Sequence, residues 1–325
     1  MKAAPGSAYG STDARHRFMR APNHIISSPV TSTVPARSLR ASTLAYVQLT
    51  KPRIIELQLV TTVPAMVVAR RGVPGAWVMA TTVIGGALAA GGANAMNCYV
   101  DRDIDEVMVR TKKRPLPTGR VEPGRALVFG VGLEVVAFAT LALWVNLLAA
   151  ALALSATVFY VVVYTMWLKR TTTQNIVIGG AAGAVPVLVG WAAITDRVGA
   201  PSLVMFAVVF LWTPPHFWAL AVRYRDDYRS AGVPMLPAVR SLEHTARQIL
   251  VYAVVLVAVT LLLGPIGHLG VLYMTTATVL GSLFIALSVR LLRSLSDSAA
   301  MRLFAFSITY LALLFAAMAA DALIR

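Results

Sequence analysis

The feature that most constrains this chain is a succession of nine long apolar stretches joined by short polar connections. Each stretch has about the 20 residues that a helix needs to cross roughly 30 Å of hydrocarbon. Strand-like alternation is absent, and only helices or closed barrels satisfy every backbone group in lipid, so helices are predicted. The stretches cover residues 54–70, 77–98, 126–143, 147–166, 176–194, 203–221, 248–266, 269–289 and 303–322.

Composition and charge support an all-α integral membrane protein. Hydrophobic residues make up 58% of the chain and charged residues 13%, too few to cover a water-soluble core. When the connections are sorted alternately to two sides, all but four of the 29 Lys and Arg fall on the side of the N-terminus, which the positive-inside rule places in the cytoplasm. The exceptions are Arg70, Arg71, Arg197 and Arg325. Because the bases are spread through connections rather than gathered on one folded face, the net charge of +15 predicts a bilayer partner and no nucleic acid.

The N-terminal region differs from the rest of the chain. Residues 1–44 are rich in Ser, Ala, Pro and Arg, contain one acid, Asp13, and lack the continuous apolar segment of a signal peptide. We expect a disordered cytoplasmic tail, with an organellar transit peptide as the alternative, followed by one membrane domain over residues 45–325. The single cysteine, Cys98, excludes an internal disulfide. Richness in Ala, Arg and Val favours a multi-pass protein of a bacterial plasma membrane, with the mitochondrial inner membrane as the alternative.

The second apolar stretch ends in a charged segment that carries the first candidate site. Asn97, Asp101 and Asp105 are four residues apart, so on a continuing helix they share one stripe, while Asp103 projects elsewhere. Clustered carboxylates repel each other, and a divalent cation relieves that repulsion. Magnesium is the natural candidate because it prefers oxygen ligands and substrate phosphates. The alternative is a solvated helix end paired with nearby bases, but ionisable groups beside a membrane helix usually mark function.

A second charged segment, residues 212–237, lies on the same predicted side. Asp226 and Asp227 are candidate ligands of a second magnesium, and guanidinium groups match phosphate oxygens. The alternative is a charged loop that only obeys topology. Gly232 and the neighbouring prolines predict a turn that folds over the site as a lid. The other candidate ligands here are Arg223, Tyr224, Arg225, Tyr228 and Arg229.

Further basic residues stand at the same predicted membrane face. Lys169 and Arg170, with Asn175 behind them, are either a diphosphate clamp or a topological signal. Lys51 and Arg53 are interpreted as interfacial anchors and, with Arg110 and Arg114, as candidate diphosphate ligands. Glu56 and Glu134 lie inside predicted helices and need polar partners. The glycines Gly179, Gly180, Gly183 and Gly190 are expected to permit close helix packing.

Acids and bases on one face that open onto apolar helices fit a substrate with a diphosphate head and a long hydrocarbon tail. Magnesium and bases would stabilise the charge that develops on the diphosphate as its carbon–oxygen bond breaks, leaving an allylic cation for the acceptor to attack. An anion transporter is the alternative from another class, although it predicts inverted repeats and charges near the bilayer midplane. The expected catalytic residues are Asp101, Asp105, Asp227, Lys169 and Arg170.

Five motifs give the chain a resemblance over roughly residues 45–320. They are LTKPR at 49–53, N-x3-D-x3-D followed by M-x-R-T-x2-R-P-L-P at 97–117, YTxxLKRxTxxNIVIGGxAGA from Tyr164, HFWALA from His216 and YxxDYxxAGxPMLP from Tyr224. With them the chain resembles the UbiA superfamily of intramembrane prenyltransferases and, within it, the protohaem IX farnesyltransferase family. A second D-x3-D, common in the superfamily, is missing because Arg223 and Ala231 stand four residues from Asp227.

The resemblance implies nine transmembrane helices around a central cavity, with a first magnesium site at Asn97, Asp101 and Asp105, and with Asp227 carried over from the second motif. It implies farnesyl diphosphate and haem b as substrates and haem O as product. A quinone precursor or a chlorin is the alternative acceptor, against which the YxxDYxxAGxPMLP motif argues. His216 and Trp218 are the candidate haem contacts, since imidazole commonly ligates haem iron, with a packing role as the alternative. Haem A synthase and oxidase-assembly proteins are the candidate protein partners.

Overall fold

The structure is a computed structural model that describes residues 39–325, except for the side chains of residues 53, 54 and 56–59. Most of the predicted tail, and the side chains of Arg53 and Glu56, therefore lie outside the described residues. The elements are α1 (Leu39–Thr50), α2 (Pro52–Arg70), α3 (Ala76–Val100), α4 (Arg102–Val107), α5 (Pro123–Trp144), α6 (Leu147–Val158), a π-helix η1 (Phe159–Leu168), α7 (Lys169–Thr171), α8 (Asn175–Thr195), α9 (Ala200–Arg223), α10 (Arg225–Ser230), α11 (Leu236–Val239), α12 (Leu242–Ile266), α13 (Val271–Ser294) and α14 (Asp297–Ile324).

The all-α membrane fold is confirmed, since residues 39–325 contain helices and no strand. Eight described helices are long and apolar enough to cross a membrane, and α6, η1 and α7 together form one of them, Leu147–Thr171. In the first predicted span the described apolar part is the shorter helix Val60–Arg70. The count of nine spans and the cytoplasmic N-terminus therefore stay predictions.

Helix α1 begins within the segment that the sequence assigned to the tail, because residues 39–44 are helical. Ala45 and Leu49, one helical turn apart, are buried against Ala95 and Cys98 of α3. The buried pair gives α1 a partner in the membrane domain and explains why the helix extends across the predicted boundary at residue 44.

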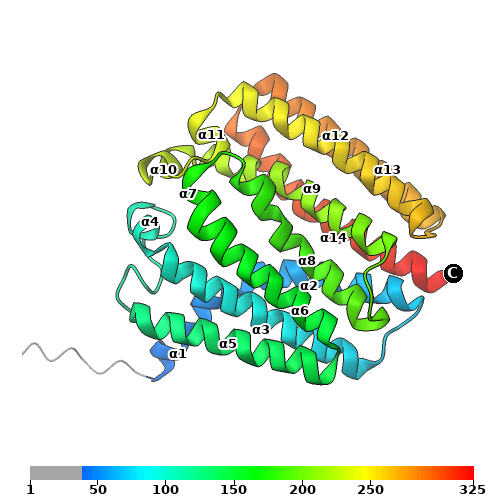
Figure 1. Cartoon of the computed structure of the whole chain (residues 1–325). Coiled ribbons are helices and arrows are strands. Elements are labelled where there is room, and N and C mark those ends of the chain that lie inside the picture. Colours follow the sequence, from blue (N-terminus) through cyan, green and yellow to red (C-terminus); the bar gives the residue numbers. More distant parts are fainter. Residues whose placement is uncertain (1–38) are drawn as a thin grey trace, which may run out of the picture. The chain divides into compact units, whose positions relative to one another are not determined.

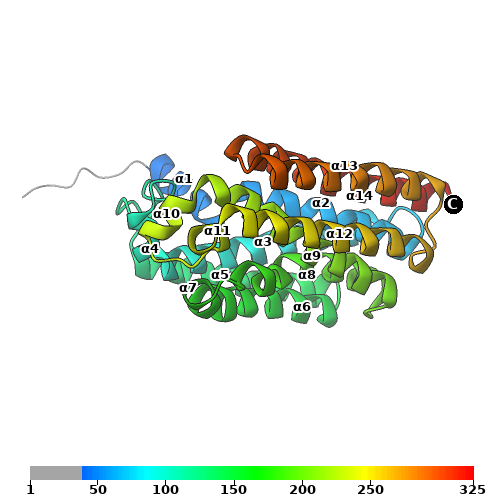
Figure 2. The ribbon, with the colours of Figure 1, turned by 90° about the horizontal axis from the view of Figure 1, so that it is seen from above.

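Helices α2, α8 and α9 hold the centre of the described domain together. Helix α8 packs on α2, α6 and α9, while α9 also packs on α12 and α14. Figure 1 shows α4, α7, α10 and α11 gathered at one end of the long helices. Seen from above, α13 and α14 lie along one side and α6 along the other (Figure 2). The described connections that the sequence analysis assigned to one side of the membrane therefore lie at the same end of the long helices.

The opposite end is closed by a small polar cluster. Asp321 of α14 is buried, and its carboxylate accepts hydrogen bonds from the backbone N–H groups of Gly270 (2.5 Å) and Tyr273 (3.2 Å) at the start of α13. Arg71 and Arg325 both donate to the carbonyl of His268. These bonds satisfy backbone groups at a helix end and a turn, so they are structural.

Three of the four glycines of α8 permit the close packing that the sequence predicted, whereas Gly183 does not, because nothing lies within 4 Å of a Cβ added there. A Cβ at Gly179 would meet the ring of Tyr164, and one at Gly180 would lie 2.9 Å from Thr213 of α9. A Cβ at Gly190 would lie 2.5 Å from the backbone oxygen of Thr62 in α2. Each close approach needs a residue without a side chain.

We expect Gly190→Ala to destabilise the protein by about 1–3 kcal/mol, because the clash is with backbone that a rotamer change cannot relieve. The matched control is Gly183→Ala in the same helix, where no atom lies within 4 Å of the added Cβ. Thermal unfolding in detergent, followed by intrinsic fluorescence, measures the difference. Equal melting temperatures for the two variants would show that the α2–α8 approach is not as tight as described.

Candidate active site

A cavity of about 540 Å³ opens between the central helices. Its polar part is lined by Lys51, Asn97, Asp105, Arg110, Arg114 and Lys169, near the end that carries α4 and α10. Its interior is lined by small residues of α3, α6 and α8 and by Trp212, Phe217, Phe304, Ile308 and Leu311 from α9 and α14. The predicted central cavity is therefore present, with a charged mouth and an apolar interior.

The predicted stripe of Asn97, Asp101 and Asp105 forms even though a helix boundary crosses it. Helix α3 ends at Val100 and α4 begins at Arg102. The helical repeat nevertheless continues, because Asp101 N–H donates to Asn97 O (2.9 Å) and Asp105 N–H donates to Asp101 O (2.8 Å). Asn97 and Asp105 line the cavity, whereas Asp101 is fully buried behind them.

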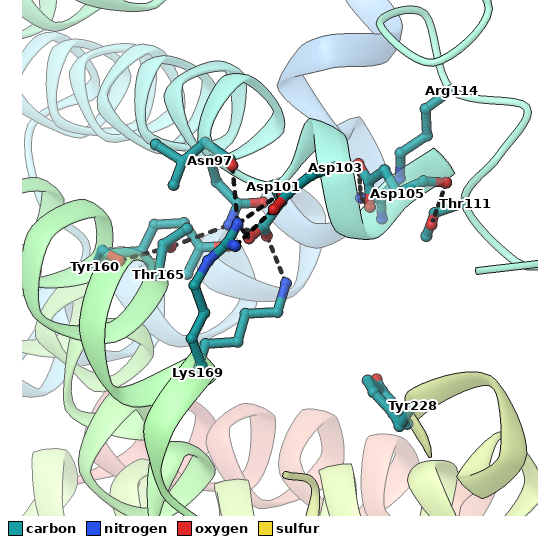
Figure 3. Close-up of polar contacts among 12 residues, drawn as sticks. Asn97, Asp101, Asp103, Asp105, Thr111, Arg114, Tyr160, Thr165, Lys169 and Tyr228 are labelled. Atoms are coloured by element: carbon teal, nitrogen blue, oxygen red, sulfur yellow. Dashed lines mark hydrogen bonds and ion pairs between the residues drawn. The ribbon is translucent and has the colours of Figure 1, made fainter. Parts of the chain in front are cut away.

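Asp101 is the most enclosed carboxylate of the site. Lys169 Nζ lies 2.5 Å from its Oδ2, which also accepts a hydrogen bond from Asn97 Nδ2 at 2.8 Å (Figure 3). Its Oδ1 has no hydrogen-bond partner within the described residues, and Arg170 Nη2 lies 3.8 Å from it. A buried carboxylate oxygen without a hydrogen bond is costly, so a further ligand at this position would be stabilising.

Asp105 and Lys51 complete the polar wall at the mouth. Arg114 Nη1 contacts both oxygens of Asp105, at 2.9 and 2.8 Å. Lys51 Nζ donates to Asn97 Oδ1 at 2.7 Å, and burial lowers the pKa of Lys51. Lys51 therefore belongs to the cavity wall as well as to the domain edge, and Asn97, Asp101 and Asp105 each have an oxygen within hydrogen-bond distance of a basic side chain.

The sequence pattern did not predict the π-helix η1, whose residues Tyr160 and Tyr164 form another wall of the cavity. Its wide turn lets Thr165 Oγ1 donate to the carbonyl of Tyr160, five residues earlier, and accept from Asn97 Nδ2 at 3.0 Å. Tyr160 and Tyr164 stack at 5.4 Å, and both line the cavity. π-Helical turns are frequent at functional sites. Apolar periodicity gives no signal for such a turn, although the YTxxLKR motif marked its end.

Arg170 points away from the cavity. Both of its terminal nitrogens bind Asp103, at 2.7 and 2.8 Å, and this hydrogen bonding lowers the pKa of Asp103 to about 2. Arg170 also donates to the carbonyl of Val100 at 3.0 Å. This pair lines a separate surface depression next to the loop after α10. Arg170 thus fastens α7 to the α3–α4 junction, while Lys169 enters the cavity.

Asp226 and Asp227, the acids of the second motif, lie next to the segment that follows the first motif, but their side chains do not line the cavity. Both oxygens of Asp227 accept backbone N–H groups, from Val109 (3.2 Å) and from Arg110 (3.1 Å). Asp226 is exposed at the surface and pairs with Arg229 at 2.6 Å. Within residues 39–325, no three His, Cys, Asp or Glu side chains converge as a metal site. The structure therefore does not bring Asp226 and Asp227 together with Asp101 and Asp105 around one ion.

Of the two tyrosines in that motif, Tyr228 lines the cavity and Tyr224 does not. Arg110 lies over the rings of Tyr224 and Tyr228, at 5.6 and 6.0 Å, and its Nη2 donates to the Tyr228 hydroxyl at 3.4 Å. Figure 3 shows Tyr228 projecting from α10 toward Asp101 and the residues that contact it. Burial raises the pKa of Tyr228, so its hydroxyl stays neutral and can donate a hydrogen bond. Asp227 therefore positions the Arg110 backbone, and Arg110 and Tyr228 line the cavity.

We expect Asp227→Ala to loosen the segment after α4 and to lower activity about tenfold or more, because two backbone N–H groups lose their charged acceptor. Limited trypsin digestion should then cut faster near Arg110, Lys112 and Lys113. Asp226→Ala is the matched control, since Asp226 pairs only with Arg229 at the surface. Unchanged digestion in Asp227→Ala together with a loss of bound metal would instead support a metal-ligand role.

The two candidate haem contacts have different environments. His216 lines the cavity, stacks on Trp212 (4.2 Å) and Phe304 (4.7 Å), and has its Nδ1 2.7 Å from Ser307 Oγ. Trp218 instead is buried in the packing of α9 on α12, edge-on to Tyr252 at 5.4 Å. His216 thus lines the cavity, whereas Trp218 lies on a different face of α9 and is packed in the hydrophobic core.

The remaining candidates lie around the site. Arg223 is exposed, and Arg225 pairs with Asp297 at 2.7 Å. Glu134 receives a hydrogen bond from Thr157 Oγ1 at 3.0 Å, which gives that acid its polar partner. Asn175 Nδ2 donates to the carbonyl of Pro234 at 3.4 Å, and Met235 lines the cavity. The turn that the sequence predicted after α10 therefore covers part of the site.

Comparison with known proteins gives a consistent picture. The model of the UbiA prenyltransferase family matches residues 58–315. A protoheme IX farnesyltransferase from Parafrankia sp. is 52% identical over 86% of this chain and 90% of its own length. Protoheme IX farnesyltransferase 1 from Saccharopolyspora erythraea is 55% identical over 88% of this chain and 92% of its own length.

Solved structures share the fold at low sequence identity. A digeranylgeranylglyceryl phosphate synthase superposes with a TM-score of 0.72 at 17% identity, over 87% of this chain and 99% of that one. A UbiA homologue from Archaeoglobus fulgidus bound to GPP and Mg²⁺ superposes with a TM-score of 0.59 at 16% identity, over 84% of this chain and 99% of that one. On its fold, its matched length and its relatives, the chain belongs to the UbiA prenyltransferase family.

Proposed function

We propose that this protein transfers a farnesyl group from farnesyl diphosphate to a vinyl group of haem b, with addition of water, to give haem O and diphosphate. The observation that carries the proposal is a single cavity that joins a mouth lined by basic side chains to an aromatic interior. The chain is also more than 50% identical to two proteins named protoheme IX farnesyltransferase. The mouth suits a diphosphate head. The interior suits an isoprenoid tail and a porphyrin face.

The diphosphate would be gripped by the bases that line the mouth. Lys51, Arg110, Arg114 and Lys169 all face the cavity, and charge-assisted hydrogen bonds to phosphate oxygens are among the stronger contacts a protein can offer. Tyr228 adds a neutral hydroxyl beside Arg110 at the same cavity. Together these groups would stabilise the negative charge that grows on the leaving oxygen.

The oxygens of Asn97, Asp101 and Asp105 fit a magnesium ion. The fit is supported by Asp101 Oδ1, a buried oxygen without a hydrogen bond, and by the preference of magnesium for carboxylates combined with substrate phosphates. Bound there, the ion would neutralise diphosphate charge as the carbon–oxygen bond breaks. The GPP- and Mg²⁺-bound Archaeoglobus homologue has the same fold, which agrees with such a site.

Substrate binding would require Lys169 and Arg114 to change partners. In the structure Lys169 pairs with Asp101 and Arg114 pairs with Asp105. When a diphosphate and a cation arrive together, the bases can turn to phosphate oxygens while the carboxylates keep a positive neighbour. Charge is therefore balanced in both states, which avoids leaving a buried carboxylate unpaired.

We also propose a cellular location and protein partners for this chain. The multi-pass membrane architecture and bacterial relatives support a bacterial plasma membrane. Haem O made in that membrane would pass to haem A synthase or to oxidase-assembly proteins, which are the proposed protein partners. A quinone precursor, a chlorin or an anion-transport role is not favoured, given the names of the relatives.

The test is product analysis by mass spectrometry. Purified protein in liposomes is incubated with haem b, farnesyl diphosphate and Mg²⁺, and haem O is expected only when all three are present. Parallel reactions offer 4-hydroxybenzoate as a quinone precursor, or a chlorin, in place of haem b. Prenylation of one of those acceptors without haem O would overturn the proposal.

A further inference from the structure

The side chain of Ser307 fixes the protonation pattern of His216. Ser307 Oγ lies 2.6 Å from the carbonyl oxygen of Phe304 and 2.7 Å from His216 Nδ1. A hydroxyl has one proton, and a carbonyl can only accept, so the Ser307 proton is donated to Phe304. Ser307 must then accept from His216, which places the imidazole proton on Nδ1 and leaves a lone pair on Nε2.

The same contacts hold the imidazole in one orientation. Trp212 Nε1 donates to the Ser307 carbonyl at 2.8 Å, which fixes α9 against α14 at this level. The rings of Trp212 and Phe304 stack on His216 at 4.2 and 4.7 Å, and Phe217 meets it edge-on at 5.2 Å. An imidazole held in this way cannot exchange its two nitrogens by turning over without breaking the Ser307 contact.

His216 also stands where the charged groups of the cavity do not reach. It lies seven residues before the end of α9 at Arg223, about 10 Å deeper along the helix. The cavity-lining carboxylate Asp105 is paired with Arg114, and the tyrosine hydroxyls are weak bases. Glu134 reaches the cavity only through Thr157. Among the side chains that the structure describes, His216 therefore supplies the candidate base of the aromatic interior through its Nε2.

We propose that His216 Nε2, held unprotonated by the positioning residue Ser307, accepts the proton of the water that completes the reaction. The inference rests on the proposed function. The vinyl electrons form the new carbon–carbon bond to farnesyl C1 as its bond to diphosphate oxygen breaks, and the inner vinyl carbon becomes a cation. Water oxygen bonds to that carbon, and one of its protons passes to Nε2. The resulting imidazolium then releases the proton to solvent water as the products leave, and the diphosphate departs as its anion.

The proposal is tested by the ratio of two products. Without His216 as proton acceptor, addition of water reverses, and the cation instead passes a proton from the newly bonded carbon to the departing diphosphate, which gives a farnesylated alkene that is one water lighter than haem O. General-base catalysis contributes about 10²–10⁴-fold, so we expect Ser307→Ala to shift the ratio of alkene to haem O by about tenfold or more. The ratio does not depend on how much of the variant folds.

Two further variants make the experiment specific. Ser307→Thr keeps the hydroxyl and is expected to retain the wild-type ratio. Ser288→Ala is the control, because Ser288 is also fully buried and bonds a helix carbonyl at 2.8 Å, that of Phe284, whereas the hydroxyl that contacts His216 belongs to Ser307. A wild-type ratio in Ser307→Ala, or an equal shift in Ser288→Ala, would overturn the proposal.

The haem complex provides a second measurement. If His216 ligated iron instead, the ferric haem complex of the wild type would show a histidine-ligated spectrum that His216→Ala abolishes, and this result would also overturn the proton-acceptor role. Absence of any farnesylated haem from the wild-type protein is a different outcome, since it refutes the proposed function itself.

Discussion

Asp101→Asn is expected to reduce haem O formation by about 10³-fold or more, while the protein remains folded in the membrane. The substitution keeps the size of the side chain but removes the charge that would hold a cation against the diphosphate, and such electrostatic stabilisation is usually the largest catalytic contribution. Asp101 is fully buried, and its Oδ1 has no hydrogen bond. Initial rates measured by mass spectrometry, at several concentrations of Mg²⁺, test the expectation.

The matched control is Asp103→Asn, two residues further along the chain. The Asp103 side chain is 61% exposed, binds Arg170 and lies outside the main cavity, so we expect activity within a few-fold of wild type. Asp101→Asn also leaves Lys169 without a carboxylate, which can destabilise the fold. The combined variant Asp101→Asn, Lys169→Met removes that charge. Full activity of Asp101→Asn would refute the metal-binding role.

Lys169→Met is expected to change two measurements in opposite directions. Turnover of farnesyl diphosphate should fall by about 10²-fold or more, because a base that would grip the leaving diphosphate is lost. Binding of a divalent ion alone should become about tenfold tighter or more, because Lys169 lies 2.5 Å from Asp101 and competes for its charge. Titration with Mn²⁺ followed by electron paramagnetic resonance measures the second effect.

The control for Lys169 is Lys112→Met in the loop after α4. Lys112 is exposed and does not line the cavity, so both measurements should match the wild type. Weaker Mn²⁺ binding in Lys169→Met would contradict a competition between Lys169 and the ion for Asp101. Unchanged turnover would show that the diphosphate is held by other bases at the mouth.

Much of the fold and of the site follows from local sequence patterns. Apolar length predicts the membrane helices, because hydrocarbon leaves a backbone no partner except itself. The spacing of Asn97, Asp101 and Asp105 predicts their common stripe, because helical geometry places residues four apart on one face. Gly179, Gly180 and Gly190 of α8 predict close approach, since small residues let membrane helices pack tightly, but the same prediction fails at Gly183.

Other features depend on contacts between distant segments, which no local pattern encodes. The role of Asp227 depends on the Val109 and Arg110 backbone, more than one hundred residues away in the chain. The sequence grouped Lys169 with Arg170, yet Lys169 pairs with Asp101 and lines the cavity, whereas Arg170 pairs with Asp103 at a separate surface depression. Trp218 and His216 share a motif but face different neighbours.

The sequence by itself determined that this protein is a helical membrane protein with acids and bases gathered at one membrane face. Those properties arise from helix periodicity and from the cost of polar groups in lipid, which act residue by residue. Only the tertiary structure decided which charges meet, that Asp101 is buried against Lys169, and that Ser307 of α14 holds His216 of α9. Pairing of this kind is set by helix packing in three dimensions, where residues far apart in the chain become neighbours.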